Sequence, residues 1–247
     1  MIRLLAWREL RSLFAMPSTW FVLAVLQFIF AWVFLETLQG FLHIQPQLAK
    51  LANPPGVTAT IGATLFYTLA LLLMMLVPMF TMRLIAEERR NQTLALLLSA
   101  PLSSYHIVLG KFFGLLTFLL ILAACVPLML YTLSLGTQLD HGLLLSNMLG
   151  LLLLSASYVA LGLYVSALTA QPVIAALGAL AVLVGLWLAD IGATAENSPW
   201  HYISPLHHFQ NFNEGLLDSR DAVFFILFTA VFLLLTMRRI HNNRIYG

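Results

Sequence analysis

Charged side chains are scarce in this sequence. Only 9% of its 247 residues are Asp, Glu, Lys or Arg, whereas ordinary soluble domains contain about 25%. Hydrophobic residues make up 61% of the chain, and the mean hydropathy is +0.92. A soluble fold of this length would have too little polar surface to cover its outside. The composition therefore predicts a membrane protein that uses lipid as its solvent.

Cysteine is nearly absent as well. Cys125 is the single cysteine in the sequence, and it lies inside an apolar run. One cysteine cannot form an intrachain disulfide, so a disulfide framework is excluded as a source of stability.

The apolar residues gather into six runs. A helix needs about 20 apolar residues to cross the hydrocarbon core of a bilayer. The runs cover residues 19–42, 61–82, 112–135, 143–169, 173–189 and 222–237, and each reaches or approaches that length. We therefore predict an all-α membrane protein with six transmembrane helices, organised as a single transmembrane domain over residues 1–247.

Ionisable side chains are missing from the centre of every predicted span. Glu36 and Asp190 lie near the ends of their runs. Ion-coupled carriers and proton pumps need charged or titratable groups at that depth, so their absence disfavours both classes. Gln27 lies deep in the first span, where we expect it to make an interhelical hydrogen bond; the alternative is a substrate contact.

The spans also lack the residues of an intramembrane hydrolase. No histidine lies inside a predicted span, and Ser155 and Ser157 have no visible base to activate them. We expect these serines, together with Ala156 and Gly162, to form a small-residue face for helix packing. The sequence therefore predicts no catalytic residue.

Gly110 and Gly114 form a GxxxG pattern at the start of the third span, which predicts close helix packing. The dipeptide Gly110-Lys111 is not part of a phosphate-binding loop. Phe112 stands where that loop needs Ser or Thr, and its first glycine is missing. We therefore expect this chain itself to bind no cofactor.

Basic residues are concentrated on one side of the predicted membrane. If both termini are cytosolic, ten of the twelve Lys and Arg residues face the cytosol, and only Lys50 and Arg220 lie outside. The ten are Arg3, Arg8, Arg11, Arg83, Arg89, Arg90, Lys111, Arg238, Arg239 and Arg244. The positive-inside rule therefore predicts a multi-pass protein with both termini in the cytoplasm.

Residues 1–16 have an amphipathic pattern, in which Arg3, Arg8 and Arg11 flank a broad apolar stripe. This pattern is typical of a helix that lies in the membrane interface. The alternative is the basic start of a signal peptide. It is disfavoured because the next apolar run is long and no small-residue cleavage site follows it.

The 83–111 segment is the one long polar interruption between two spans. It opens with four charges at residues 87–90, becomes amphipathic, and breaks at Pro101. We expect a helix at the inner membrane surface, followed by a second short helix over residues 103–110. Such a cytosolic segment suits docking of a soluble partner, and the alternative is an ordinary solvated loop.

The 190–221 segment is the largest predicted outer loop. Its aromatic residues alternate with amide and imidazole side chains, a mixture that favours the headgroup level of the membrane. The aromatic residues are Trp200, Tyr202, Phe209 and Phe212. We expect two short re-entrant helices in the outer leaflet, broken at Pro199 and Pro205.

Five of the seven histidines lie on the predicted outer side. They are His43, His141, His201, His207 and His208. Imidazole is a good ligand for zinc and copper, but neither cysteine nor an HxxxH-type spacing accompanies these histidines. We therefore interpret them as polar residues of interfacial loops and expect no metal site.

Two stretches resemble the ABC-2 type transporter permeases. Residues 86–114 read AEERRNQTLALLLSAPLSSYHIVLGKFFG, which is similar to the segment after the second span of that family. Residues 203–236 read ISPLHHFQNFNEGLLDSRDAVFFILFTAVFLLLT, which is similar to its end. The resemblance covers nearly the whole chain and points to the branch of gliding-motility and copper-enzyme-maturation permeases.

The resemblance implies a type V exporter-like fold in the bacterial inner membrane. Such permeases pair with a second identical or paralogous permease, and with two copies of a separate ABC ATPase that binds ATP and Mg. Periplasmic or accessory subunits and membrane lipids are further expected partners, and nucleic acid is not.

The resemblance also implies roles for individual segments. Residues 1–16 would form the interface helix, the 83–111 segment would hold the cytosolic coupling helix, and the 190–221 segment would gate the exit. The implied coupling residues are Glu87, Glu88, Arg89, Arg90, Thr93, Pro101, Ser103 and Ser104. The implied outer-gate residues are Pro199, Pro205, His207, His208, Phe209 and Phe212.

The implied function is a permease subunit that couples ATP hydrolysis by its ATPase partner to export of a substrate. The apolar spans favour an amphipathic or lipid-like substrate over a bare ion. The alternative is a membrane scaffold or force-transmitting subunit without cargo, which would share the same fold and the same ATPase.

Overall fold

The computed structural model describes residues 1–247 except for 49–55, 93–102, 136, 138, 193–199 and 247. In this part of the chain every regular element is a helix, and no strand occurs. Six helical stretches are long and apolar enough to cross a membrane. The predictions of an all-α protein and of six spans are therefore confirmed.

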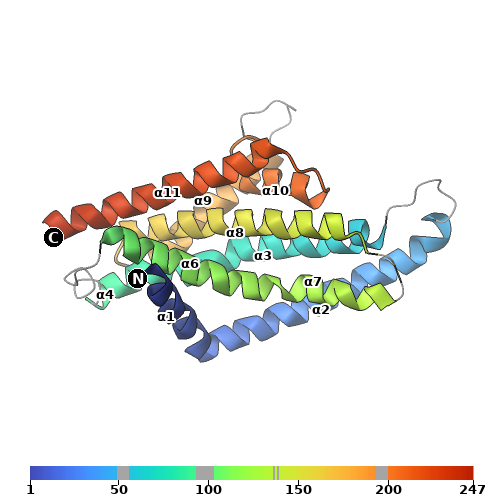
Figure 1. The fold of residues 1–247 in the computed structure, drawn as a ribbon, viewed down its shortest axis with the longest axis horizontal. Coiled ribbons are helices and arrows are strands. Elements are labelled where there is room, and N and C mark those ends of the chain that lie inside the picture. Colours follow the sequence, from blue (N-terminus) through green and yellow to red (C-terminus); the bar gives the residue numbers. More distant parts are fainter. Residues whose placement is uncertain (49–55, 93–102, 136, 138, 193–199, 247) are drawn as a thin grey trace.

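The helices follow one another along a single elongated bundle (Figure 1). They are α1 (Ile2–Ala15), α2 (Pro17–Leu48), α3 (Ala63–Met82), α4 (Glu88–Arg90), α6 (Ser104–Ala123), α7 (Cys125–Thr132), α8 (His141–Leu168), α9 (Pro172–Ile191), α10 (Pro205–Asn213) and α11 (Ser219–Tyr246). Two π-helical turns, η1 (Thr58–Gly62) and η2 (Arg83–Glu87), flank α3, and the 3-10 turn η3 (Leu133–Leu135) follows α7.

The two ends of the bundle carry different elements. We call the end where α4, the start of α6 and the end of α11 lie the charged end (Figure 1). The opposite end holds the start of α3, the start of α8 and the short helix α10. The two sets of predicted functional residues therefore lie at different ends.

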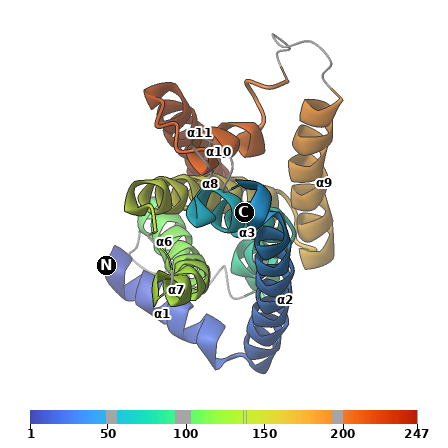
Figure 2. The ribbon, with the colours of Figure 1, turned by 90° about the vertical axis from the view of Figure 1, so that its right-hand side faces the viewer.

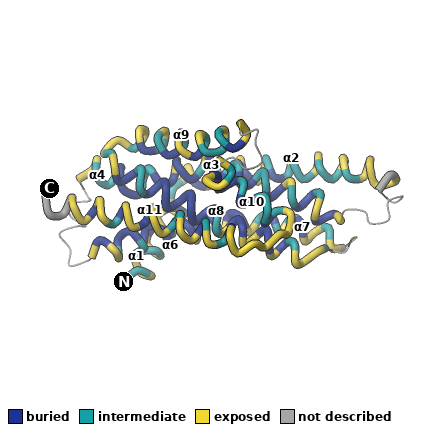
Figure 3. The backbone as a smooth tube through the Cα atoms, turned by 90° about the horizontal axis from the view of Figure 1, so that it is seen from above, coloured by how far each residue is buried: buried dark blue, intermediate teal, exposed yellow. Residues whose placement is uncertain are grey.

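Helix α8 is the centre of the bundle. It contacts α3, α6, α9, α10 and α11, and Figure 2, which views the bundle along its length, shows α10 and α11 above it and α6 below it. Its most apolar stretch is 67% buried inside the chain, whereas the corresponding stretch of α2 is 11% buried. The backbone view in Figure 3 shows the same division, with buried residues along the middle and exposed ones on the outer faces. Exposed apolar faces on α2, α9 and α11 are suited to lipid contact.

The small-residue face predicted on α8 lies inside the chain. Ser155 and Ser157 are fully buried, and their hydroxyls donate to the carbonyls of Leu151 and Leu154, each at 2.7 Å. Ala156 belongs to the same core. This face therefore packs against the chain's own helices, and the serine hydroxyls are satisfied within α8.

Two predicted boundaries are wrong. The second span was expected to end at residue 82, but its helix continues through η2 to Arg90. No separate short helix covers residues 103–110, because α6 begins at Ser104 and continues unbroken to Ala123. The extension of the third span includes Lys111, whose charge is compensated by the ion pairs described below.

Helix α2 touches the rest of the bundle only along part of its length. Gln27 makes the interhelical contact expected of it, since its Nε2 donates to Met129 Sδ on α7 at 3.6 Å. Beside this contact, a hollow of about 330 Å³ lies between α2 and the α6–α7 junction. Cys125, half-buried, lines this hollow together with Trp20 and Leu122.

Gly162 provides a test of the packing between α8 and α3. A Cβ at this position would lie 2.8 Å from Thr81 Cγ2 and 2.9 Å from Thr81 Cβ, and Thr81 is itself buried on α3. We expect Gly162→Ala to destabilise the fold by about 1–3 kcal/mol, as overpacking does. This loss opposes the helix propensity of alanine, which favours it over glycine by up to about 1 kcal/mol.

The measurement is the thermal unfolding midpoint in mild detergent. Gly185→Ala on α9 is the matched control, because nothing lies within 4 Å of a Cβ at that position. The control should melt at or above the wild-type temperature. Equal midpoints for the two variants would contradict the close approach of α3 and α8.

Candidate functional site

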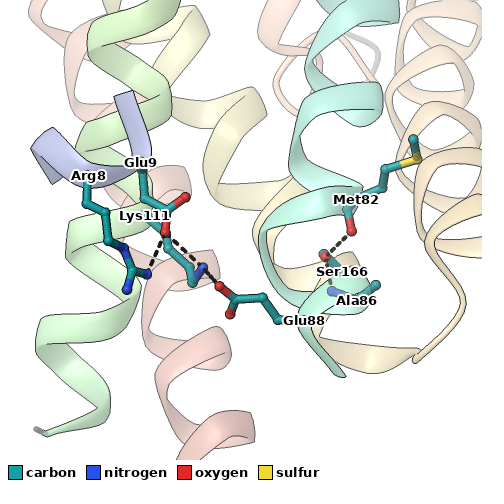
Figure 4. A network of polar contacts seen from close by, with 7 residues as sticks. All are labelled: Arg8, Glu9, Met82, Ala86, Glu88, Lys111 and Ser166. Carbon is teal, nitrogen blue, oxygen red and sulfur yellow. Dashed lines mark hydrogen bonds and ion pairs between the residues drawn. The ribbon is translucent and has the colours of Figure 1, made fainter. Parts of the chain in front are cut away.

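A buried lysine joins three helices at the charged end of the bundle. Lys111, in the second turn of α6, is only 2% exposed. Its Nζ lies 2.6 Å from Glu88 Oε1 on α4 and 3.2 Å from Glu9 Oε1 on α1 (Figure 4). Arg8 Nη2 contacts the same Glu9 oxygen at 3.1 Å. We call these four residues the Lys111 network.

Two glycines allow the Lys111 network to form. Gly110 and Gly114 lie on the face of α6 that α1 covers. A Cβ on Gly110 would lie 2.5 Å from Leu5 Cβ, and one on Gly114 would lie 2.9 Å from the carbonyl oxygen of Ala6. Any larger residue would force α1 away from α6. The GxxxG pattern thus brings Glu9 close enough to pair with Lys111.

The charges of the Lys111 network balance. Arg8 and Lys111 contribute two positive charges, and Glu9 and Glu88 contribute two negative ones. A buried ammonium costs several kcal/mol of desolvation unless charges and hydrogen bonds compensate it. The side chains of Glu9 and Glu88 are 12% and 23% exposed, so they too are largely removed from water. Each of the three central groups therefore needs the others.

The π-helical turn η2 is held by a serine from α8. In a regular α-helix, the Ala86 amide would donate to the Met82 carbonyl. Here the Ser166 hydroxyl stands between them: it accepts from Ala86 N at 3.0 Å and donates to Met82 O at 3.4 Å (Figure 4). Arg89 Nη1 adds a contact to Ala167 O at 3.4 Å. The end of the second span is thereby fixed to the end of α8.

The structure places the predicted coupling residues in two groups. Glu87, Glu88, Arg89 and Arg90 form the last turns of the second span, and Ser103 and Ser104 begin α6. Thr93 and Pro101 lie outside the described residues. Glu88 and Arg89 point into contacts with α6 and α8, whereas Arg90 is exposed and Glu87 is half-buried.

The start of α6 borders a hollow at the charged end. Ser103 Oγ lies 2.5 Å from His106 Nδ1, and Ser104 is 8% exposed. The hollow measures about 500 Å³ and lies between these first residues of α6 and the last turns of α11, where Arg238 and His241 line it. A partner that bound at the start of α6 would therefore also contact this hollow.

At the opposite end, α10 is anchored to α8 by its aromatic side chains. Phe209 and Phe212 are 0% and 1% exposed, and a Cβ on Gly150 of α8 would lie 2.5 Å from Phe212 Cβ. Ser146 Oγ donates to Phe212 O at 2.8 Å. Asn213 Nδ2 donates to Ala63 O at the start of α3 at 3.1 Å. Helix α10 thus packs onto the core of the bundle.

His208 connects α10 to α11. Its Nδ1 lies 2.6 Å from Asp221 Oδ1 at the start of α11, and its Nε2 lies 3.2 Å from the carbonyl oxygen of Tyr202. Asn211 Nδ2 donates to the other Asp221 oxygen at 2.8 Å. The imidazole also stacks on Phe224, with ring centroids 4.0 Å apart. Both nitrogens of this ring and both oxygens of this carboxylate are therefore used.

The predicted outer-gate residues do not share one environment. Pro205 begins α10 and His207 faces Asp190 of α9, while Pro199 lies outside the described residues. Of the four aromatic residues predicted to lie at the headgroup level, Phe209 and Phe212 are buried inside the chain, where Gly150 leaves room for them against α8. Trp200 and Tyr202 are 51% and 63% exposed, as expected. In the described part of the 190–221 segment, α10 is the one helix that lies between α9 and α11.

The family model described as ABC-2 family transporter protein matches residues 3–243, which is nearly the whole chain. The chain belongs to this family. The permease is therefore the membrane component of an ABC transporter rather than a catalytic subunit, and the family implies an ABC ATPase as its partner. Together with the six apolar helices, this makes it a multi-pass membrane protein. No curated protein matches the chain.

Sequence reasoning missed two residues that organise the charged end of the permease. Glu9 is 102 positions from Lys111. The one feature of the sequence that could have pointed to it is that it is an acidic residue in an amphipathic helix whose other charged residues are basic. Ser166 was visible only as one small residue of the fourth span. Neither contact could be inferred from local spacing, because each depends on how distant helices pack.

Lys111→Met tests the Lys111 network. The variant would leave Glu9 and Glu88 facing each other without the ammonium between them. Removing one partner of a buried ion pair costs about 3–5 kcal/mol, so we expect a clear loss of thermal stability. The triple variant Glu9→Gln, Lys111→Met, Glu88→Gln should recover most of it, since neutralising all partners of a buried pair is often tolerated.

Unfolding in detergent, followed by circular dichroism, measures both variants. The exposed Arg220→Met is the control for removing a cation and should melt like the wild type. A Lys111→Met permease that melts like the wild type would contradict the interdependence of the three helices.

Asp221→Ala tests the attachment of α10 to α11. The change removes the acceptor for both His208 and Asn211 and leaves a buried imidazole without its partner. Hydrogen bonds to charged groups are worth about 1.5–3 kcal/mol, so α10 should open more often. Limited proteolysis within the 190–221 segment should become faster. Glu214→Ala, at an exposed acidic residue next to α10, should cleave at the wild-type rate.

Proposed function

We propose that the permease acts in the bacterial inner membrane as one of two membrane subunits of an exporter. In this proposal both termini face the cytoplasm, so the charged end of the bundle faces the ATPases. Two copies of a separate ABC ATPase bind ATP and Mg and drive the transport. The second membrane subunit is another copy of the permease or a paralogue, and the substrate is amphipathic or lipid-like.

The Lys111 network is the observation that supports coupling at the charged end. The described residues of the 83–111 segment lie in η2, in α4 and at the start of α6, and Glu88 and Lys111 join α4 to α6 by an ion pair of 2.6 Å. Glu9 extends the same contact to α1. A force applied to the segment therefore acts on α4, α6 and α1 together.

The coupling residues have different roles in this proposal. Among the described residues no hydrogen bond or ion pair involves the side chain of Glu87 or Arg90, and Arg90 is exposed, so we assign these two to contact with the ATPase. Glu88 and Arg89 act as internal ties, to α6 and to α8 respectively. Ser103 and Ser104 border the hollow at the start of α6, where the ATPase would make a second contact. Rigid elements with such ties transmit displacement through packed side chains.

The opposite end supports a role for the 190–221 segment in release. Helix α10 rests on α8, α3 and α11, so a rotation of these spans would move it. Pro205, His207 and His208 lie on this helix, and the two histidines connect it to α9 and α11. Exposed apolar faces on α2, α9 and α11 are available to lipid, to a lipid-like substrate and to the second membrane subunit.

The test uses the permease purified with its ATPase partner in mild detergent. We expect the double charge reversal Glu87→Lys, Arg90→Glu to weaken the association by roughly tenfold or more, which corresponds to about 1.4 kcal/mol. Loss of the ATPase band and of ATP hydrolysis from the purified complex measures the effect. Glu88 is left unchanged because its reversal would place a cation beside Lys111.

The matched control is Glu214→Lys, Arg220→Glu, the same charge exchange at exposed positions of the opposite end. It should copurify normally. An intact complex with unchanged ATP hydrolysis in the Glu87/Arg90 variant would show that the ATPase docks elsewhere. If hydrolysis were indifferent to every added amphipathic compound, the scaffold function would be favoured over transport.

A further inference from the structure

Three metal-ligating side chains meet where α9 ends and α10 begins. Asp190 is in the last turn of α9, His201 lies in the turn before α10, and His207 lies in the first turn of α10. The Nδ1 atom of His201 is 2.6 Å from Asp190 Oδ1, and that of His207 is 3.5 Å from the same oxygen. One ligand atom from each residue lies within 4.8 Å of the other two.

We infer that Asp190, His201 and His207 form a binding site for Zn²⁺. Bonds of about 2.0–2.2 Å in a tetrahedral zinc site separate its ligand atoms by roughly 3.3 Å. The two separations from Asp190 Oδ1, 2.6 and 3.5 Å, lie on either side of that value, and all three ligand atoms lie within 4.8 Å of one another, so rotations of the side chains would create the site. Three protein ligands leave the fourth position to water.

The neighbouring His208 is a structural histidine of the same segment, and its partners provide a comparison for those of His207. Both of its ring nitrogens and both oxygens of its partner Asp221 are occupied by other groups of the chain. His207 differs, because its Nδ1 faces a carboxylate oxygen at 3.5 Å, beyond the usual length of a hydrogen bond. The rings of His201 and His207 lie 4.9 Å apart, tilted by 30°, with both Nδ1 atoms directed at one oxygen. His201 makes the same 2.6 Å contact with its carboxylate as His208 does, and a cation between the two imidazoles and this oxygen would bind His207 as well.

The donor set selects the class of ion. Two imidazoles and one carboxylate suit zinc, whereas calcium and magnesium prefer oxygen ligands and Cu(I) prefers sulfur. The sulfur of Cys125 is on α7 and is not part of the cluster. The Asp190 side chain is 10% exposed and that of His207 is 38% exposed, so the site is anchored on one side and open on the other.

Zinc at this site would link α9 to α10 through coordination bonds. The ion would therefore stabilise the end of the fifth span against the segment that precedes the last one. This reverses the sequence-based expectation that the histidines are merely polar residues of a loop. That expectation was based on spacing, and the three ligands lie eleven and six positions apart in the sequence.

The experiment uses the full-length permease purified in mild detergent through a tag without histidine. After dialysis against Zn²⁺ and removal of free metal, elemental analysis counts zinc per chain. We expect one zinc in the wild type and none in the His201→Ala, His207→Ala variant. Losing two ligands should weaken binding by more than roughly 100-fold, because changes to outer-shell partners alone cost about 10–100-fold.

His141→Ala is the matched control, since His141 is an exposed histidine at the same end of the bundle but outside the cluster. It should retain one zinc per chain, and zinc should raise its melting temperature as it does for the wild type. The double variant should show no such shift. Asp190→Asn, which preserves size, provides a second loss-of-binding variant whose fold is checked by gel filtration.

A wild-type permease that holds no zinc after dialysis would overturn the inference. Equal zinc content in the wild type and in a folded double variant would overturn it as well. Cobalt substitution adds an independent measurement, because Co²⁺ in a four-coordinate site gives an intense visible spectrum. That spectrum should appear in the wild type and in His141→Ala, and should be missing in Asp190→Asn.

Discussion

The packing of α1, α4 and α6 at the charged end of this permease depends on one buried ammonium group. Lys111 is removed from water inside the bundle, and a charge in that position persists only with compensating charges at contact distance. Glu88 and Glu9 supply them from two other helices. The consequence is structural as well as electrostatic: the second span continues to Arg90, the third begins at Ser104, and α1 lies across α6 rather than apart from it.

The π-helical turn η2 is linked to the position of Lys111, because the turn precedes Glu88, which pairs with that lysine. A π turn misplaces the amide of Ala86 relative to the carbonyl of Met82, and Ser166 compensates by bonding to both. Such turns are rare and occur often at functional positions. Here the turn directs Glu88 toward Lys111 while Arg89 contacts the end of α8. Glu88 and Arg89 thus serve packing inside the chain, whereas Arg90 is exposed and Glu87 is half-buried.

The number and type of the spans could be predicted because bilayer thickness sets the length of an apolar run. Their limits could not, since the second span runs on to Arg90 and the third begins at Ser104, and the ion pair between Glu88 and Lys111 in these extensions is not visible in the apolar pattern. Part of the candidate site could likewise be predicted from the sequence and part of it could not. The charges at residues 87–90 were visible as a group, but Glu9 and Ser166 became relevant only through helix packing. Phe209 and Phe212 looked like interfacial aromatics until the space beside Gly150 placed them in the core.

The single cysteine has a practical consequence that follows from the loose attachment of α2. Cys125 is half-buried and lines the hollow that separates α2 from the α6–α7 junction. One fluorophore attached to the unmodified sequence would therefore stand at the seam between the first span and the rest of the bundle. Its emission would report the environment of this hollow without any engineered labelling position.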